Sequence, residues 1–151
     1  MKDIQPVTVV MVEDEDAHAT LIERNLRRAG IINPIVRLKN GQEVLDFLFN
    51  QGQFTDHVRP SHLLVMLDLN MPEVDGYQVL HTMKHHEETR LIPVVILTTT
   101  NDPHEVQRCY ELGCNNFVTK PVDPVAFAKT IQSMGVMMAI MSYPCCLLSK
   151  G

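Results

Sequence analysis

The chain has 151 residues, of which 45% are hydrophobic and 21% charged, and its formal net charge is −5. This composition is ordinary for a globular domain, and the length suits one domain with a sizeable core. The acidic balance gives no electrostatic support to a role in binding nucleic acid.

Three further features of the sequence bear on where the chain works. Residues 1–6 contain no apolar signal core, so we expect a cytoplasmic protein. The longest apolar stretch, residues 136–141, is much shorter than the roughly 20 residues that a membrane span needs. No two cysteines have CxxC spacing, so we expect free or buried thiols in a reducing compartment; the cysteines are Cys109, Cys114, Cys145 and Cys146.

The first third of the chain alternates strand-like and helix-like patterns. Nearly every residue of Val7–Val12 is apolar, which predicts a strand buried on both faces. A helix is predicted over Asp16–Ala29, and Gly30 suits its end. A short second strand over Pro34–Leu38 then leads into a second helix over Gly41–Asn50.

The rest of the chain continues this alternation. Residues Gln51–Ser61 include Gly52 and Pro60 and are predicted to form a loop. The later strands are predicted at His62–Leu67, Pro93–Leu97 and Asn116–Val118. The helices between them are predicted at Tyr77–His85 and Pro103–Leu112, and a fifth helix starts at Asp123, with apolar residues at Phe127, Ile131, Met134 and Met138. Five β–α units in this order predict a three-layer α/β domain with a parallel sheet and right-handed crossovers.

Polar residues stand where four of the predicted strands end. Glu13 and Asp14 follow the first strand, Asp68 the third, Thr98 the fourth and Lys120 the fifth. The carboxyl ends of parallel strands form the ligand-binding edge of such sheets, so the acids would converge if strands one and three are neighbours. Mg²⁺ prefers oxygen ligands, and a bound cation would relieve the repulsion among three carboxylates. The pattern therefore predicts a site for a divalent cation and for a phosphoryl group on Asp68.

Each of these residues also has a plain structural interpretation. The run Glu13–Asp16 suits a helix start, where the helix dipole favours acids. Thr98 could simply be a β-branched residue that ends a strand, and Lys120 a solvated surface lysine. Asp68 shifts the balance, because an acid that closes an otherwise apolar strand needs a reason. Pro121, directly after Lys120, restricts the backbone at the lysine.

Taken together, the motifs resemble a response-regulator receiver domain over about residues 7–133. In chain order they are Val-Val-Met-Val-Glu13-Asp14, Leu-Asp68-Leu-Asn70-Met71-Pro72-Glu73-Val74-Asp75-Gly76, Val-Ile-Leu-Thr98 and Lys120-Pro121. Each motif alone is modest, but the set in this order and at these separations is specific. The resemblance implies a doubly wound (βα)5 fold with flavodoxin-like strand order 2-1-3-4-5 and helices on both faces. We expect one domain over residues 1–151, with an apolar extension at about 134–148.

The resemblance also implies roles for the acids. Asp68 would be the phospho-acceptor, and Glu13 and Asp14 would hold Mg²⁺ together with Asp68 and the backbone carbonyl of Asn70. The family often has Asp at the first acidic position, and Glu13 is a common variant of it. The chain would thus accept a phosphoryl group from a sensor histidine kinase of a two-component system, without being an enzyme beyond its own phosphorylation and dephosphorylation.

Three more residues would respond to the phosphoryl group. Thr98 would be the switch hydroxyl, drawn toward the new dianion, and Lys120 would pair with the phosphoryl charge. Phe117 would be the switch aromatic and turn into the space that Thr98 leaves, although it lacks the hydroxyl that a tyrosine has. The surface of the fourth helix, fifth strand and fifth helix would then change, as a population shift biased by phosphorylation.

The C-terminal extension is unusually apolar for the end of such a domain. Its residues cover every face of a helix, and Pro144 should end that helix at about Tyr143. Either a partner subunit buries these residues or the segment folds back on its own domain. Of the two, we expect a homodimer through the fifth helix and residues 134–148, because Met-rich surfaces adapt well to partners. This extension and the loop Gln51–Ser61 resemble the single-domain regulators paired with bacterial phytochrome kinases.

An enzyme, a cofactor binder and a scaffold of the same fold each fit the sequence less well than a receiver domain. A phosphohydrolase with an aspartyl nucleophile needs an acid two positions after Asp68, where Asn70 stands. A nucleotide or flavin binder would want a Gly-rich or Ser/Thr-rich loop after the first strand, in place of Glu13–Asp16. A non-phosphorylated dimeric scaffold is disfavoured because no key position is missing. His81 and His85 have the spacing of a zinc pair, but with no evident third ligand an exposed polar face is the better interpretation.

Overall fold

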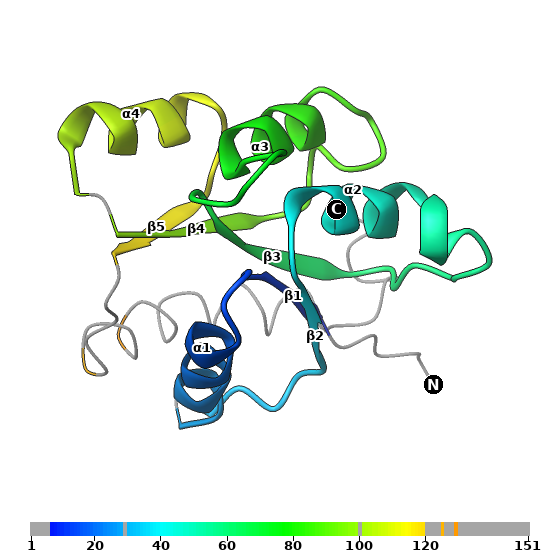
Figure 1. The fold of residues 1–151 in the computed structure, drawn as a ribbon, viewed down its shortest axis with the longest axis horizontal. Coiled ribbons are helices and arrows are strands. Elements are labelled where there is room, and N and C mark those ends of the chain that lie inside the picture. Colours follow the sequence, from blue (N-terminus) through cyan, green and yellow to red (C-terminus); the bar gives the residue numbers. More distant parts are fainter. Residues whose placement is uncertain (1–6, 29, 100, 120–124, 126–128, 130–151) are drawn as a thin grey trace, which may run out of the picture.

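A computed structural model describes residues 7–28, 30–99, 101–119, 125 and 129 of the chain. Five strands and four α-helices alternate in it (Figure 1). The elements are β1 (Thr8–Val12), α1 (Asp16–Arg28), β2 (Ile35–Leu38), α2 (Gly41–Phe49), the 3-10 turn η1 (Gly52–Phe54), β3 (Leu63–Asp68), α3 (Gly76–Lys84), β4 (Val94–Thr98), α4 (Pro103–Glu111) and β5 (Asn116–Thr119). The predicted fifth helix, Lys120 and the extension at 134–148 lie outside the described residues.

The five strands form one sheet in the order β2-β1-β3-β4-β5, and every neighbouring pair is parallel. The predicted fold class and strand order are therefore confirmed. β1 and β3 are direct neighbours, with Val12 opposite Leu67, so the residues that follow Val12 lie beside Asp68. From β1 the sheet grows in one direction to β2 and in the opposite direction to β3, β4 and β5. The strand order therefore reverses between β1 and β3, and such a switch point opens a crevice at the carboxyl ends of the strands.

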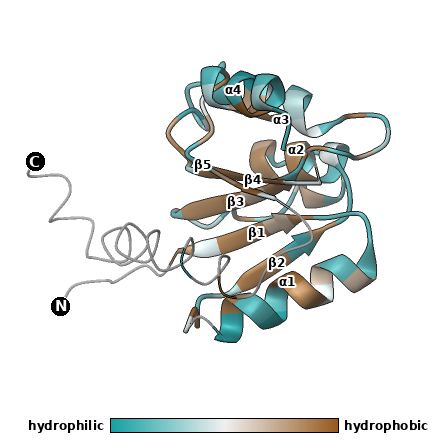
Figure 2. Cartoon of the chain, turned by 90° about the vertical axis from the view of Figure 1, so that its left-hand side faces the viewer, coloured by the Kyte–Doolittle hydropathy of each residue, from teal (hydrophilic) through white to brown (hydrophobic). Residues whose placement is uncertain are grey.

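Helices cover both faces of the sheet (Figures 1 and 2). α2, α3 and α4 lie on one face and α1 on the other. Alternate residues of each central strand enter different cores: Val10, Val65 and Ile96 pack on the α2–α3 side, and Met11 and Met66 on the α1 side. Because both faces of these strands are buried, the strands need apolar residues at nearly every position. Asp68 is the exception in β3.

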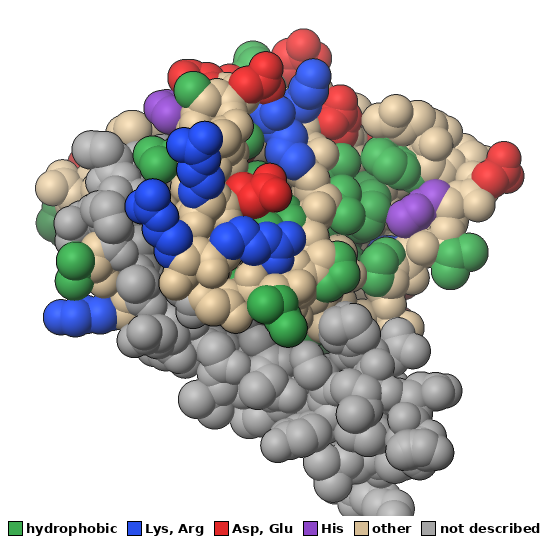
Figure 3. Space-filling model, turned by 90° about the horizontal axis from the view of Figure 1, so that it is seen from below, with side chains coloured by type: hydrophobic (Ala, Val, Ile, Leu, Met, Phe, Trp, Pro, Cys, Tyr) green, Lys and Arg blue, Asp and Glu red, His purple; other side chains and the backbone are tan. Residues whose placement is uncertain are grey.

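The α1 helix shows the sequence logic of the outer layer. Its inner face buries Ala19, Ile22 and Leu26, and its outer face carries exposed arginines such as Arg24 and Arg28. Basic side chains accordingly gather on the side of the molecule that α1 covers (Figure 3). This net-negative chain thus has a locally basic face next to an acidic strand edge.

The element boundaries differ from prediction by one or two residues at most. The main differences are that β3 includes Asp68 and that α3 starts at Gly76. The predicted loop Gln51–Ser61 contains η1, where the Phe54 ring packs edge-on against Phe47 at 5.3 Å between centroids. Among the described helices, none has the length and apolarity required to cross a bilayer.

Candidate functional site

The first acidic residue, Glu13, continues β1 at its carboxyl end. Its backbone N–H donates to the carbonyl of Leu38 at 3.0 Å, and its own carbonyl accepts two hydrogen bonds from Arg37, at 3.0 and 2.7 Å. The side chain is fully buried, and its Oε2 atom accepts a weak hydrogen bond from the N–H of Glu15 at 3.3 Å. Backbone contacts with β2 thus fix a buried carboxylate at the sheet edge.

Arg37 also keeps a neighbouring acid out of this cluster. Its guanidinium donates to the carboxylate of Asp16 at 2.6 Å. This hydrogen bond and the arginine charge hold the pKa of the Asp16 carboxyl below its usual value. Asp16 therefore opens α1 as an ion-paired residue, while Glu13 and Asp14 face the sheet edge.

Asp68 is the last residue of β3, and only 3% of it is exposed. Its Oδ1 atom accepts a hydrogen bond from the backbone N–H of Asn70 at 3.0 Å. The N–H of Leu69 donates to the carbonyl of Leu97 at 3.2 Å, so β4 holds the backbone just past the acid. The buried aspartate is thereby oriented by its own chain.

The three predicted acids converge. Glu13, Asp14 and Asp68 each offer a carboxylate oxygen, and these three oxygens lie within 4.8 Å of one another. Two of the residues are buried and Asp14 is exposed, so the cluster has one side open to solvent. This all-oxygen set with room for waters fits Mg²⁺ or a similar hard cation, which prefers a few carboxylates and retained waters. Among the described residues it is the one group of three or more such ligands.

Thr98 ends β4 and is fully buried. Its Oγ1 atom accepts a hydrogen bond from the side-chain amide of Asn70 at 3.3 Å, and the same amide lies 3.5 Å from Oγ1 of Thr99. The side chain of Asn70 therefore bridges the loop after β3 to the end of β4. For Asn70, only a role of the backbone carbonyl as a metal ligand was predicted, and its place just after the end of a strand was the only signal for this side-chain contact.

The loop that follows Asp68 is tightly constrained. Glu73 adopts a left-handed backbone conformation, with φ of 65°. The chain then returns to the strand end, where the N–H of Gly76 donates to the carbonyl of Leu69 at 3.1 Å. A Cβ atom on Gly76 would lie 2.6 Å from the carbonyl oxygen of Asp68 and 2.7 Å from Cα of Leu69, so only glycine fits. The sequence motif included Gly76 but gave it no role.

The remaining predicted switch residues are only partly visible. Phe117 lies in β5 opposite Ile96 and is half-buried against the core on the α2–α3 side. Thr98 is paired with Thr119 in the same register. Lys120, the next residue, lies outside the described residues, so its contact with Asp68 stays a prediction.

A histidine pair and two cysteines that lie away from the acidic cluster do not form sites of their own. His81 and His85 are exposed, with their rings stacked at 4.0 Å between centroids, and no third ligand joins them among the described residues. Cys109 and Cys114 are buried free thiols, as predicted. Burial raises the pKa of both thiols, that of Cys114 to about 12, which makes them poor nucleophiles at neutral pH.

Known proteins share this arrangement. The family model described as "Response regulator receiver domain" matches residues 9–132. The solved structure of the bacteriophytochrome response regulator RtBRR is similar, with a TM-score of 0.77 and 32% identity, and the match covers 86% of this chain and 78% of that one.

Two further solved structures of response regulators are similar as well. The Mn(2+)-bound form of response regulator Rcp1, from Synechocystis sp., has a TM-score of 0.72 and 33% identity, and the match covers 85% of this chain and 91% of that one. The phosphorylated cyanobacterial phytochrome response regulator RcpA has a TM-score of 0.75 and 26% identity, and the match covers 92% of this chain and 98% of that one.

Proposed function

This chain belongs to the response regulator receiver domain family, and from that premise we propose that it is a stand-alone regulator that accepts a phosphoryl group on Asp68. The observation that carries the proposal is the convergence of Glu13, Asp14 and Asp68, with carboxylate oxygens within 4.8 Å of one another. RcpA, a similar regulator, has been solved in phosphorylated form, and the match spans 98% of its chain.

In the proposed reaction, the Asp68 carboxylate attacks the phosphorus of a phosphohistidine on a sensor kinase. A P–O bond forms as the P–N bond breaks, and the leaving imidazole nitrogen keeps the electron pair. The product is an acyl phosphate, which water can hydrolyse. The N–H of Asn70 donates to one carboxylate oxygen of Asp68 and thereby orients the acid at the sheet edge.

The charge of the phosphoryl group must be offset for this attack to occur. Glu13, Asp14, Asp68 and the backbone carbonyl of Asn70 would hold Mg²⁺, which supplies positive charge next to the phosphoryl oxygens when it is bound. The Mn(2+)-bound structure of Rcp1 supports a divalent cation in this kind of protein. Lys120 would supply a second positive charge.

An alternative reaction, hydrolysis of a substrate through an aspartyl-phosphate enzyme, has less support. It requires a general acid two residues after the nucleophile, and Asn70 cannot protonate a leaving group. Its side-chain amide is instead hydrogen-bonded toward Thr98. The other alternative, a non-phosphorylated scaffold of the same fold, leaves the convergence of three acids without a purpose.

The direct test is intact-protein mass after incubation with acetyl phosphate, with Mg²⁺ and with EDTA. We expect one phosphoryl adduct with Mg²⁺ and none with EDTA, because the unscreened acids repel the anionic donor. Peptide mapping should place the adduct on residue 68. A protein that stays unmodified under all conditions would favour the scaffold.

The conformational response is expected to depend on Thr98. Replacing Thr98 with Ala removes the hydroxyl that would bond the phosphoryl oxygen, so we expect the variant to be phosphorylated but to show a clearly smaller change than the wild type in the α4–β5 region. Backbone NMR shifts with and without acetyl phosphate measure this. Thr99→Ala, at the exposed neighbouring threonine, is the matched control and should respond normally. A full response in Thr98→Ala would exclude the switch role.

For partners, we propose a sensor histidine kinase of the phytochrome type and a second copy of this chain. The similarity to the bacteriophytochrome response regulator RtBRR and to the cyanobacterial phytochrome response regulator RcpA supports the first. The apolar sequence at 134–148 supports the second. The proposal includes no nucleic acid or membrane partner and keeps the expected cytoplasmic location.

The proposed dimer predicts twice the 17.1 kDa chain mass in light scattering after size exclusion. Met138→Asp adds a charge within the apolar extension and should shift the equilibrium toward monomer, because a buried unpaired charge is costly. Ser149→Asp adds the same charge beyond that extension and should leave the dimer intact. Monomer alone at high concentration of the wild type would exclude the dimer.

A further inference from the structure

Within the described part of the chain, α4 buries few side chains against the rest of the domain. Of its nine residues, Pro103–Glu111, only Cys109 is buried. Its first turn is capped by its own loop, where Asp102 accepts a hydrogen bond from the N–H of His104 at 2.9 Å. With so little buried area, the position of α4 depends on specific contacts at its surface.

Tyr77 of α3 supplies such a contact. Its hydroxyl donates to the Glu105 carboxylate at 3.0 Å, and the guanidinium carbon of Arg108 lies 4.0 Å from the centre of its ring. A single side chain of α3 thus engages two residues that are one turn apart on α4. Partial burial and the hydrogen bond to Glu105 raise the pKa of Tyr77 to about 12, so the hydroxyl stays protonated and remains a donor at neutral pH.

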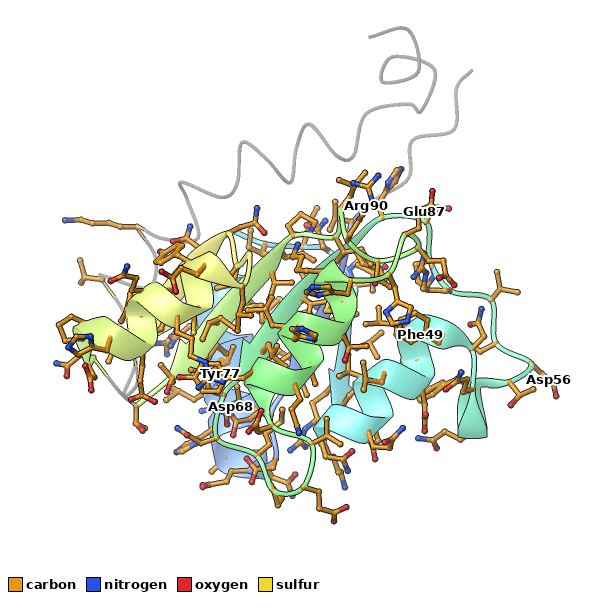
Figure 4. All side chains as sticks on the ribbon, turned by 90° about the horizontal axis from the view of Figure 1, so that it is seen from above. Phe49, Asp56, Asp68, Tyr77, Glu87 and Arg90 are labelled. Atoms are coloured by element: carbon orange, nitrogen blue, oxygen red, sulfur yellow. The ribbon has the colours of Figure 1, made fainter. Side chains whose placement is uncertain are left out.

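The backbone next to Tyr77 packs against the residue that is the proposed phospho-acceptor. Tyr77 directly follows Gly76, which has no room for a side chain against the carbonyl of Asp68 and Cα of Leu69. In Figure 4, Asp68 is at the end of the sheet and Tyr77 in the first turn of α3. A shift of the backbone at Asp68 must therefore be passed to Gly76 and Tyr77, since packed backbone atoms cannot be compressed.

α4 is also connected to the site from its own side, because β4 ends at Thr98 only a few residues before the helix. Resting on the proposed function, we propose that Tyr77 is a latch that holds α4 in its unphosphorylated position. Phosphorylation of Asp68 then moves α4 by two routes, through Thr98 and through Gly76–Tyr77. Tyr77 is a positioning residue in this scheme, with no contact to the phosphoryl group.

The surroundings of Tyr77 allow the latch to open. A hollow of about 360 Å³ lies between α3 and α4, lined by Tyr77, Gln78, His81, Thr82, Arg108 and Leu112. The hollow borders the side chain of Tyr77, so a phenol ring released from Glu105 has open space beside it. Both Tyr77 and Glu105 are only half-buried, so opening the contact leaves their polar atoms within reach of water.

Hydrogen exchange over α4 tests the latch without any phosphoryl donor. Tyr77→Phe keeps the ring over Arg108 and removes only the hydroxyl. We expect α4 amides to exchange about tenfold faster in this variant, as a hydrogen bond to a charged group is lost, with the sheet unaffected. Tyr110→Phe, which changes an exposed tyrosine on α4 itself, is the matched control and should exchange like the wild type.

A second comparison separates a latch from a purely structural contact. After phosphorylation with acetyl phosphate and Mg²⁺, the wild type and Tyr77→Phe should converge in α4 exchange, because the latch is already open. Glu105→Ala should also speed α4 exchange, and the two changes together should speed it less than the product of their separate effects. Equal exchange of Tyr77→Phe and wild type before phosphorylation would overturn the latch, and so would a difference that persists undiminished afterwards.

The outcome also separates this proposal from the proposed function. If acetyl phosphate leaves the wild type unmodified, the receiver chemistry and the coupling to Asp68 both fail. The comparison of unphosphorylated proteins would then still report whether Tyr77 holds α4. If the adduct forms but α4 is insensitive to Tyr77, only the latch fails.

Discussion

Asp68→Asn should form no Mg²⁺-dependent phosphoryl adduct with acetyl phosphate. The amide has no nucleophilic oxygen anion, and its neutral charge removes one of three carboxylates that would bind the cation. The fold should persist, because the asparagine carbonyl can still accept the hydrogen bond from the N–H of Asn70. We expect stability in EDTA within about 1 kcal/mol of the wild type, and complete loss of the adduct.

A matched substitution on the same loop serves as the control. Asp75 caps α3 by accepting from the N–H of Gln78 at 2.9 Å, and an asparagine can make the same cap. Asp75→Asn should therefore keep both the stability and the adduct. Thermal shifts add a second readout: Mg²⁺ should stabilise the wild type and Asp75→Asn, and should stabilise Asp68→Asn much less. An adduct of undiminished yield on Asp68→Asn would show that another residue is the acceptor.

The fold was predictable because the sequences of its central strands are compatible with few structures other than buried parallel strands. A run such as Leu63–Leu67 is apolar at every position, as both faces of the strand are buried, and its alternation with amphipathic helices indicates a parallel sheet. Strand boundaries were less certain. Asp68 belongs to β3 by its backbone although its side chain is charged, because the ladder to β4 continues to the pair Asp68 and Leu97.

The acids of the site were predictable for a related reason: a charged residue that ends a buried strand has no packing role. The sequence did not indicate their unequal environments, with Glu13 buried and Asp14 exposed. Burial there depends on the register of β1 with β2 and on the contact of Arg37 with the Glu13 backbone. Such long-range geometry leaves no trace in local spacing.

Two hydrogen bonds between side chains of different elements were not predicted. Asparagine is common in loops, so nothing in the sequence singles out Asn70, yet its side-chain amide donates a hydrogen bond to Thr98. Tyr77 fits the pattern of a helix residue, yet its hydroxyl bonds Glu105 on the next helix along the chain. Both depend on how two loops or helices sit beside each other, which periodicity does not encode.

Gly76→Ala is expected to be strongly destabilising. The added Cβ would lie 2.6 Å from the carbonyl oxygen of Asp68 and 2.7 Å from Cα of Leu69, and both are backbone atoms of the acceptor segment. Because neither can swing aside, α3 must shift or the segment must bend, at a cost of about 2–4 kcal/mol. We expect the thermal midpoint to fall by roughly 5–15 °C. The phosphorylation rate should also fall at temperatures where the variant is folded, since the same displacement moves Asp68.

Gly30→Ala makes the comparison specific. Gly30 follows the far end of α1, has a φ of 90°, and has no atom within 4 Å of an added Cβ. Its substitution costs only the strain of a left-handed backbone, about 1 kcal/mol, and should leave the phosphorylation rate unchanged. If Gly76→Ala were as stable and as reactive as Gly30→Ala, the backbone at Asp68 would have to yield easily. The mechanical link from Asp68 through Gly76 to Tyr77 would then be too soft to move α4.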